Sequence, residues 1–234
     1  MNMSCPLSPR RFTLALAVVA ALALLPLRNL KAADAELAPI PLKLPTQAFK
    51  GTPTDPPPDT NVEKPTGKPR PPFLAPKGIV NVALNKKVTS SDKQPITGTL
   101  ELVTNGDKEA TDNSFVELHR KTQWVQLDLE KDQTMYAIVI WHNHATPAIY
   151  RDVIVQLADD ADFTQNVKTL FNNDYDNSSG LGVGTDREYF ETNEGKLIDA
   201  KGAKARYVRF YSKGSTDSAL NYYTEIEIFA TPAP

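Results

Sequence analysis

Short runs in which apolar and polar residues alternate recur from Ile79 to Ala230. They read TQWVQLDLE, YRDVIVQLA, ARYVRFYS and YYTEIEIFA, and a further run, MYAIVIW, is continuously apolar. Alternation with period two places one side of a strand against a core and the other side in water, which is typical of antiparallel sheets. The loops between these runs are rich in Asn, Asp, Gly and Ser. The pattern therefore predicts an all-β domain, a β-sandwich or jelly roll of many short strands.

The first 35 residues have a different pattern. Arg10 and Arg11 precede the 16-residue run FTLALAVVAALALLPL, which ends shortly before the small-residue site ADA at 33–35. This layout is typical of a secretory signal peptide, and the run is shorter than the roughly 20 residues of a membrane-spanning helix. We predict that residues 1–35 are a signal peptide and that the protein is secreted or periplasmic, without a membrane span after cleavage. The alternative is an uncleaved N-terminal anchor.

Residues 36–77 are dominated by proline and contain 12 of the 19 prolines of the chain. Proline removes backbone donors and favours the extended polyproline II conformation. We predict a disordered, semi-rigid linker that is exposed and holds the following domain, residues 78–232, away from whatever the N-terminus meets. The alternative is a proline-rich ligand for a partner domain.

Charge and cysteine content narrow the classes of partner. Removal of residues 1–35 takes away four of the 26 basic and one of the 28 acidic residues, leaving 22 against 27 and a net charge of −5. Without a basic excess or stripe, we expect no nucleic-acid partner.

The only cysteine, Cys5, precedes the apolar run, so the predicted mature chain has no disulfide. Its stability must come from an apolar core, to which a bound metal can add.

Six segments follow one another in an order that resembles the discoidin domain, also called the coagulation factor type C domain. They are NVALNKKVTSS, LVTNGDKEAT, QWVQLDLEKDQTMYAIVIW, YRDVIVQLADDADF, ARYVRFYS and TEIEIFA. The order is equally similar to that of related galactose-binding-like carbohydrate-binding modules. The resemblance covers residues 79–230 and implies an eight-stranded jelly-roll β-sandwich. Because this fold serves sugars, lipids, peptides and proteins, the ligand has to be argued from the site itself.

The resemblance also implies a structural calcium ion. In the related domains a loop of the type DGxxxxT and a glutamate of the last strand hold the ion, and the matching positions are Asn105, Asp107, Thr111 and Glu225. Such oxygen donors suit calcium, which takes six to eight of them. Asn105 stands where the family has Asp, and the spacing to Thr111 is one residue longer than usual. The alternative is an ordinary Asn-Gly turn with solvated acids.

A candidate ligand face begins at the end of the apolar run, in WHNHATPAIYRDV. A sugar site needs an aromatic face for the ring and planar polar groups for the hydroxyls, and this stretch holds both kinds of residue. We predict a face made by Trp141, His142, His144, Tyr150 and Arg151, and completed by Asp174, Asp176 and Tyr222 if their loops meet at one end of the sandwich. Two alternatives concern single residues: Trp141 belongs to the core, and His142 with His144 holds a transition metal.

The acidic stretch FNNDYDNSSGLGVGTD, residues 171–186, invites a metal-loop interpretation that its spacing rejects. Counted from Asp174, the sixth position is Ser179 instead of Gly and the twelfth is Thr185 instead of Glu, so it does not match the helix-loop-helix calcium loop. Its glycines suit an irregular connection with positive φ. We predict a loop between two strands, FNND ending one and REYFE beginning the next, that forms one wall of the ligand face.

Familiar catalytic motifs are absent from the sequence: it has no GxSxG, no HExxH and no phosphate-binding loop. We therefore predict a non-catalytic, exported module that binds a glycan or cell-surface polysaccharide. The first alternative is a protein-interaction or matrix-structural module of the same fold. The second is a small glycoside hydrolase, because two carboxylates of such an enzyme need only meet in space.

Overall fold

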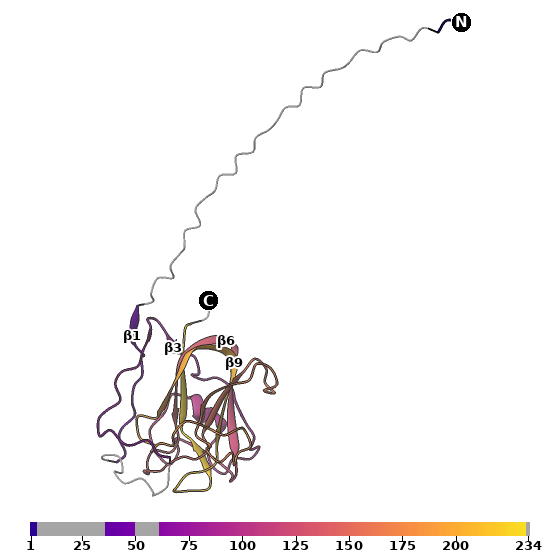
Figure 1. The fold of residues 1–234 in the computed structure, drawn as a ribbon. Coiled ribbons are helices and arrows are strands. Elements are labelled where there is room, and N and C mark those ends of the chain that lie inside the picture. The colour runs from indigo at the N-terminus through magenta and orange to yellow at the C-terminus, as the bar shows by residue number, and fades with distance from the viewer. Residues whose placement is uncertain (4–35, 50–60, 233–234) are drawn as a thin grey trace. The chain divides into compact units, whose positions relative to one another are not determined.

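The computed structural model describes residues 1–3, 36–49 and 61–232, so most of the predicted signal peptide lies outside the described residues. In these residues the chain forms eleven β-strands and one short 3-10 helix, η1 (Leu100–Thr104). The strands belong to three antiparallel sheets, one large and two small (Figure 1). The all-β prediction is confirmed, while the described residues hold eleven strands where the resemblance implied eight.

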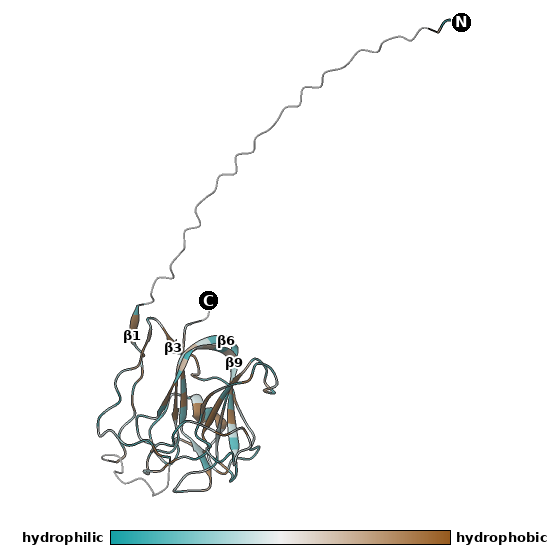
Figure 2. Cartoon of the chain, viewed as in Figure 1, coloured by the Kyte–Doolittle hydropathy of each residue, from teal (hydrophilic) through white to brown (hydrophobic). Residues whose placement is uncertain are grey.

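The large sheet contains seven strands, and its long central members β6 and β9 organise it. The order is β3 (Val80–Asn81), β11 (Glu225–Ala230), β6 (Gln123–Trp141), β9 (Lys196–Ser212), β7 (Ile154–Ala158) and β8 (Lys168–Asn172), and β4 (Val88–Ser90) also pairs with β6. Hydrophobic and hydrophilic residues alternate along much of β6 and β9 (Figure 2). This alternation gives the sheet two faces, and each face is covered by a different part of the chain.

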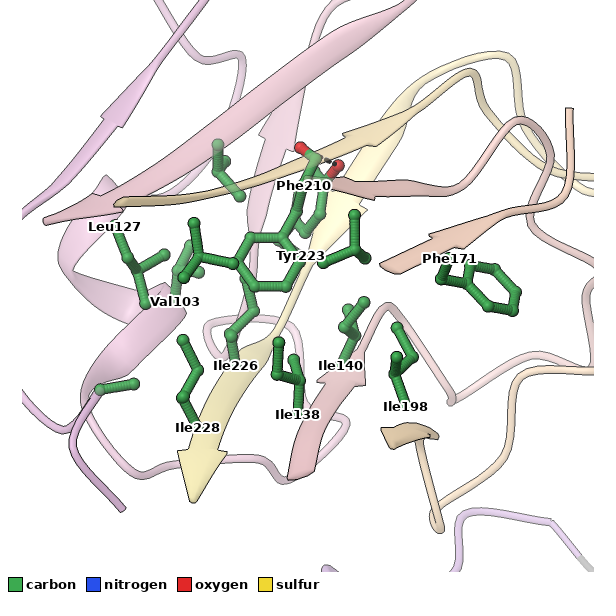
Figure 3. Close-up of a cluster of buried hydrophobic side chains, with 14 of the residues drawn as sticks. Val103, Leu127, Ile138, Ile140, Phe171, Ile198, Phe210, Tyr223, Ile226 and Ile228 are labelled. Carbon is green, nitrogen blue, oxygen red and sulfur yellow. Dashed lines mark hydrogen bonds between the residues drawn. The ribbon is translucent and has the colours of Figure 1, made fainter. Parts of the chain in front are cut away.

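The main core lies between the large sheet and a small sheet of two strands, β5 (Val116–Leu118) and β10 (Asn221–Tyr223). Branched side chains such as Ile138, Ile140 and Ile226 point from the large sheet toward Tyr223 of the small one (Figure 3). The Tyr223 hydroxyl donates to the carbonyl of Phe210 at 3.1 Å, which satisfies its buried polar atom. This packing confirms the predicted sandwich of two layers.

Two predicted runs are divided differently in the structure. TQWVQLDLE and MYAIVIW, predicted as separate strands, form the single strand β6, which pairs with β9 along its length through a register shift between Asp128 and Gln133. Conversely, YYTEIEIFA splits at Thr224 into β10 of the small sheet and β11 of the large one. Local alternation does not reveal where a strand bends or changes sheet, because both depend on the pairing partner.

The described parts of the predicted linker pack on the other face of the large sheet. β1 (Leu37–Pro39) pairs with β2 (Leu74–Pro76), and Ile40 and Ala75 are buried beside Trp141 and Phe229. Arg70 fixes this segment, since its guanidinium donates to the carbonyls of Glu194 and Gly195 at 2.7 and 2.8 Å. Most residues of 36–49 and 61–77, called the strap below, are exposed, as expected of a spacer, but Ile40, Val62 and Ala75 are buried against the domain. Proline content indicated extended chain correctly but carried no information on what the chain contacts.

Candidate ligand-binding site at the loop end

A cavity of about 270 Å³ opens where several connections between strands meet. Four separate segments of the chain form it. Its walls are Ile149, Arg151, Asp152, Tyr175, Asp176, Ser178, Glu188, Lys213 and Thr216. Tyr175 is 54% exposed, so its ring presents a free aromatic surface at the cavity.

Backbone pairing holds the cavity segments together. The Arg151 amide donates to the carbonyl of Gly214 at 3.0 Å, and the Lys213 amide donates to the carbonyl of Arg151 at 2.9 Å. On the other side, Ile149 forms an isolated bridge with Phe190. The REYFE run, which we predicted to begin a strand, thus contributes isolated bridges instead of a regular strand. These hydrogen bonds hold the backbone of Arg151 beside that of Lys213, and Glu188 is held by its own isolated bridge to Val62.

Aspartate side chains from within and outside the acidic loop hold its backbone and hydroxyl groups in place. Asp174 is fully buried, and its two carboxylate oxygens accept hydrogen bonds from the amides of Ser178 and Ser179, each at 2.9 Å. Asp152 accepts from the hydroxyls of the same two serines at 2.7 and 3.1 Å. Side-chain oxygens of Asp152, Asp174 and Asp176 lie within 4.8 Å of one another, and this group could hold a metal ion.

The pKa values of the acids at the cavity are shifted in different directions. Burial raises the pKa of Asp174, and the nearby charge of Asp152 raises it further. Hydrogen bonds from the hydroxyl and amide of Ser178 lower the pKa of the exposed Asp176. Burial raises the pKa of Glu188, whereas the positive charge of Arg151 opposes this effect. The cavity therefore combines carboxylates of unequal acidity with two cations, Arg151 and Lys213.

The structure brings three of the predicted face residues together. Arg151 and Asp176 line the cavity, and Asp174 lies behind it as the anchor of the acidic loop. Tyr222 belongs to another part of the surface: its hydroxyl donates to Glu117 at 2.7 Å and its ring packs edge-on against Phe115. Tyr175 and Lys213 were missed, although Tyr175 stands between the two aspartates that we had selected.

Four other predicted face residues are buried, and their side chains have no surface for a ligand to contact. Trp141 is fully buried and its indole N–H donates to the carbonyl of Asn193 at 2.9 Å. His142 is fully buried, pairs with Glu191 at 3.0 Å and stacks on Tyr150 at 4.1 Å between ring centroids. The chain after β6 reaches the surface only at residues 145–147, and Trp141, His142 and Tyr150 on either side of this turn are buried.

The two histidines also separate in space. His144 is fully buried, and its Nε2 lies 2.8 Å from the carbonyl of Lys108, while His142 contacts Glu191. In the part of the chain that the structure describes, neither histidine belongs to a group of metal-ligating side chains. Strand spacing does not apply to this pair, since β6 ends at Trp141.

The predicted calcium residues lie in the loop after η1 and at Glu225, and a hydrogen bond from the loop backbone joins the two. Glu225 of β11 is fully buried, and one of its oxygens accepts a hydrogen bond from the Gly106 amide at 3.1 Å. Its other oxygen, Oε1, has no hydrogen-bond partner among the described residues. Asn105 and Asp107 are exposed and accept from amides of their own loop at 2.8 and 3.0 Å, and Thr111 contacts Ser114 at 2.5 Å. Burial raises the pKa of Glu225 to about 9, with the charge of Glu227 adding to the effect.

The sequence matches no protein-family model and no curated protein sequence. Among solved structures it is similar to a family 89 glycoside hydrolase from Clostridium perfringens in complex with PUGNAc, with 18% identity over 65% of this chain, 15% of that one and a TM-score of 0.49. It is also similar to the family 32 carbohydrate-binding module of AlyQ in complex with 4,5-unsaturated mannuronic acid, with 20% identity, 61% and 93% coverage and a TM-score of 0.45.

A further similar structure is a fucose-binding module of Streptococcus pneumoniae, with 17% identity, coverage of 64% of this chain and 96% of that one, and a TM-score of 0.43. This chain thus spans a small part of the hydrolase and nearly the whole of each binding module. No helix among the described residues is long and apolar enough to cross a membrane.

Proposed function

We propose that this protein is an exported, non-catalytic module that binds a glycan or cell-surface polysaccharide in the cavity at the loop end. One observation supports this most directly: a concave site joins the exposed ring of Tyr175 to the side chains of Arg151, Asp176 and Lys213. An aromatic ring can pack on the apolar face of a pyranose, and planar charged groups can bond pairs of hydroxyls. The cavity is slightly smaller than the roughly 300 Å³ at which pockets for drug-sized ligands begin, so it suits a single sugar ring.

Direct binding measurements test this proposal. The purified chain from residue 36 is titrated calorimetrically with oligosaccharides of several classes, and its migration is followed in gels that contain soluble polysaccharides. We expect binding to at least one class, and a loss of about tenfold or more in Tyr175→Ala and in Arg151→Ala. Leu84→Ala is the matched control, because Leu84 is an exposed hydrophobic residue that does not line the cavity. Binding that persists unchanged in both cavity variants would place the glycan elsewhere.

The second part of the proposal is a structural calcium ion held by Asn105, Asp107, Thr111 and Glu225. The buried Glu225 carboxylate with its unpartnered Oε1 supports it, since a buried carboxylate needs a compensating charge. The donors are carboxylate, amide and hydroxyl oxygens, which suit a hard cation. The ion would supply positive charge to this loop and join it to β11.

The compartment follows from the N-terminal pattern. Because residues 1–35 are predicted to be a signal peptide, we propose secretion or export to a periplasm. Fractionation of cells that express the full chain tests this: the protein is expected outside the cytoplasm and shortened at its N-terminus, and N-terminal sequencing identifies the cleavage site. Retention of the full-length chain in the membrane fraction would favour the uncleaved anchor.

A further inference from the structure

The walls of the loop-end cavity carry more negative than positive charge. Asp152, Asp176 and Glu188 line it together with the two cations Arg151 and Lys213, so three carboxylates face two positive groups. Asp174 stands directly behind this wall, with an oxygen within 4.8 Å of those of Asp152 and Asp176. Counting Asp174, four carboxylates against two cations leave two negative charges at one site.

Glu188 is a cavity acid without a hydrogen-bond donor among the described residues. It is 5% exposed and lines the cavity, and no described residue donates a hydrogen bond to its carboxylate. Its backbone, in contrast, is firmly held by the strap: Glu188 donates to the carbonyl of Asn61 at 3.1 Å and accepts from the amide of Glu63 at 2.8 Å. A nearly buried carboxylate without a donor is costly unless a ligand supplies one.

Of the two cations, Lys213 is already engaged by protein groups. The Lys213 ammonium lies 3.5 Å from the Asp152 carboxylate and donates to the carbonyl of Ser178 at 3.3 Å. Arg151 is exposed, and its charge acts on Glu188. The carboxylate of Asp176, which lines the cavity, accepts from Ser178 and also shares a hydrogen bond with the Asp174 carboxyl. The groups that can receive a ligand are therefore the Glu188 and Asp176 carboxylates and the Arg151 guanidinium, beside the open ring of Tyr175.

We propose that the cavity selects a cationic sugar, that is, a hexosamine unit whose amino group is not acetylated. This inference rests on the proposed glycan-binding function and specifies its ligand. The ammonium of the sugar donates to the carboxylates of Glu188 and Asp176, and the ring packs on Tyr175. An ammonium beside an aromatic face gains further attraction. Acetylation removes both the charge and two of the three donors, so it weakens binding.

Calorimetric titration with matched oligosaccharides tests this selectivity. Oligomers of equal length are compared in low salt: glucosamine, N-acetylglucosamine, neutral glucose and uronic acid. We expect glucosamine oligomers to bind at least about tenfold more tightly than N-acetylglucosamine oligomers, with the difference shrinking as salt is raised. If neutral or acidic oligomers bind as well or better, the glycan-binding function stands and the cationic selectivity is wrong. If none of the four binds, the cationic selectivity is wrong, and the titrations with the other oligosaccharide classes decide whether the glycan-binding function stands.

Two conservative variants locate the selectivity. Glu188→Gln and Asp176→Asn keep the shape of the side chain, and each should weaken the binding of glucosamine oligomers more than that of N-acetylglucosamine oligomers, so that the preference falls by about threefold to tenfold. Asp162→Asn is the control, since Asp162 is exposed in the loop that follows the far end of β7. Unaltered melting temperatures exclude a folding defect. A preference that both variants retain overturns the proposal.

The aspartate cluster offers a different outcome that the same experiment detects. Titrations are repeated with EDTA and with added calcium. Glucosamine binding that is independent of the metal supports the direct contact of ammonium and carboxylate. The same titrations are made with Glu225→Gln, which removes the other proposed calcium site. Oligomer binding that still requires the metal in this variant would mean that Asp152, Asp174 and Asp176 hold an ion at the site, and the proposal would be overturned.

Discussion

The Gly106 amide donates to one oxygen of the buried Glu225 carboxylate at 3.1 Å, while the second oxygen of Glu225 faces no donor among the described residues. This contact joins the loop after η1 to the last strand of the large sheet. Because the loop and the strand are 119 residues apart, whatever compensates this carboxylate also ties distant parts of the domain together.

Calcium is therefore expected to stabilise the folded domain. Removal of calcium with EDTA should lower the melting temperature measured by calorimetry or circular dichroism, and calcium in excess should restore it, because a ligand that binds only the folded state stabilises it by mass action. At a free concentration about 100 times the dissociation constant, the gain is about 2.7 kcal/mol.

The variant Glu225→Gln separates the ion from the fold. It removes the buried charge and keeps the side-chain oxygen that accepts from Gly106, so it should abolish the response to calcium. Glu101→Gln, at an exposed position of η1, should respond like the wild type. A melting temperature that does not respond to EDTA or calcium in the wild type would contradict the proposed ion.

The strap should contribute to stability through Ile40. Ile40 is 7% exposed and packs with Ile79, Trp141 and Phe229, so truncation of its side chain in Ile40→Ala should cost about 2 kcal/mol or more in urea denaturation. Leu37→Ala is the control: Leu37 is 59% exposed, and its loss should change the free energy of unfolding by less than about 0.5 kcal/mol. Equal and negligible effects at both positions would restore the exposed spacer that the proline content suggested.

Gly195 is required for the close approach between the start of β9 and Trp141. Its φ is +62°, and a Cβ at this position would lie 2.8 Å from the carbonyl oxygen of Ile140 and from atoms of the Trp141 ring. Gly195→Ala should therefore destabilise the domain by about 2 kcal/mol or more, measured by denaturant unfolding, through backbone strain and overpacking together.

Gly180 provides the matched comparison for Gly195. It has a similar φ of +74°, but nothing lies within 4 Å of a Cβ added there. Gly180→Ala should lower the free energy of unfolding only through backbone strain, by about 1 kcal/mol. The difference between the two variants measures the packing around Trp141, and its absence would refute the close contact.

The Asp128 and Arg206 pair should make stability depend on pH in the acid range. The Arg206 guanidinium donates two hydrogen bonds, at 2.7 and 2.8 Å, and these lower the pKa of Asp128. A carboxyl whose pKa is lower in the folded state stabilises the fold above its unfolded pKa, and this contribution disappears as the pH falls through the folded pKa. Asp128→Asn should thus cost about 0.5–1 kcal/mol at pH 7, since the pair is partly exposed, and less in high salt.

Unfolding measured at pH 7 and near pH 2 tests the sign of this effect. Near pH 2 the wild type and Asp128→Asn should have the same free energy of unfolding. The control is Asp132→Asn, because Asp132 and Lys204 lie 3.4 Å apart with more than half of each side chain exposed. That variant should differ little from the wild type at either pH. A cost of Asp128→Asn that persists at low pH would mean that the hydrogen bonds act without the charge.

Much of the fold was predictable because it depends on local periodicity. Alternation within β6, β9 and β11 indicates which side chains enter the core, and the structure places Ile138, Ile140 and Ile226 there. A strand with period-two alternation and one buried face can pair in few other registers, because a shift of one residue would turn its apolar side chains to the solvent. The union of two runs into β6 and the division at Thr224 were not predictable, since they depend on distant partners.

The site was predictable only in part, and the reason is the same. The sequence by itself determined an all-β domain, an acidic loop after β8, and Arg151 and Asp176 as residues suited to a ligand. Only the tertiary structure decided that Trp141, His142, His144 and Tyr150 are buried, and that Lys213 and Glu188 join Tyr175 at one cavity. It also decided that the strap packs on the sheet and pairs with Glu188. Residue spacing fixes the direction of a side chain within a regular strand, but the ends of strands and the loops take their direction from the contacts that the whole chain makes.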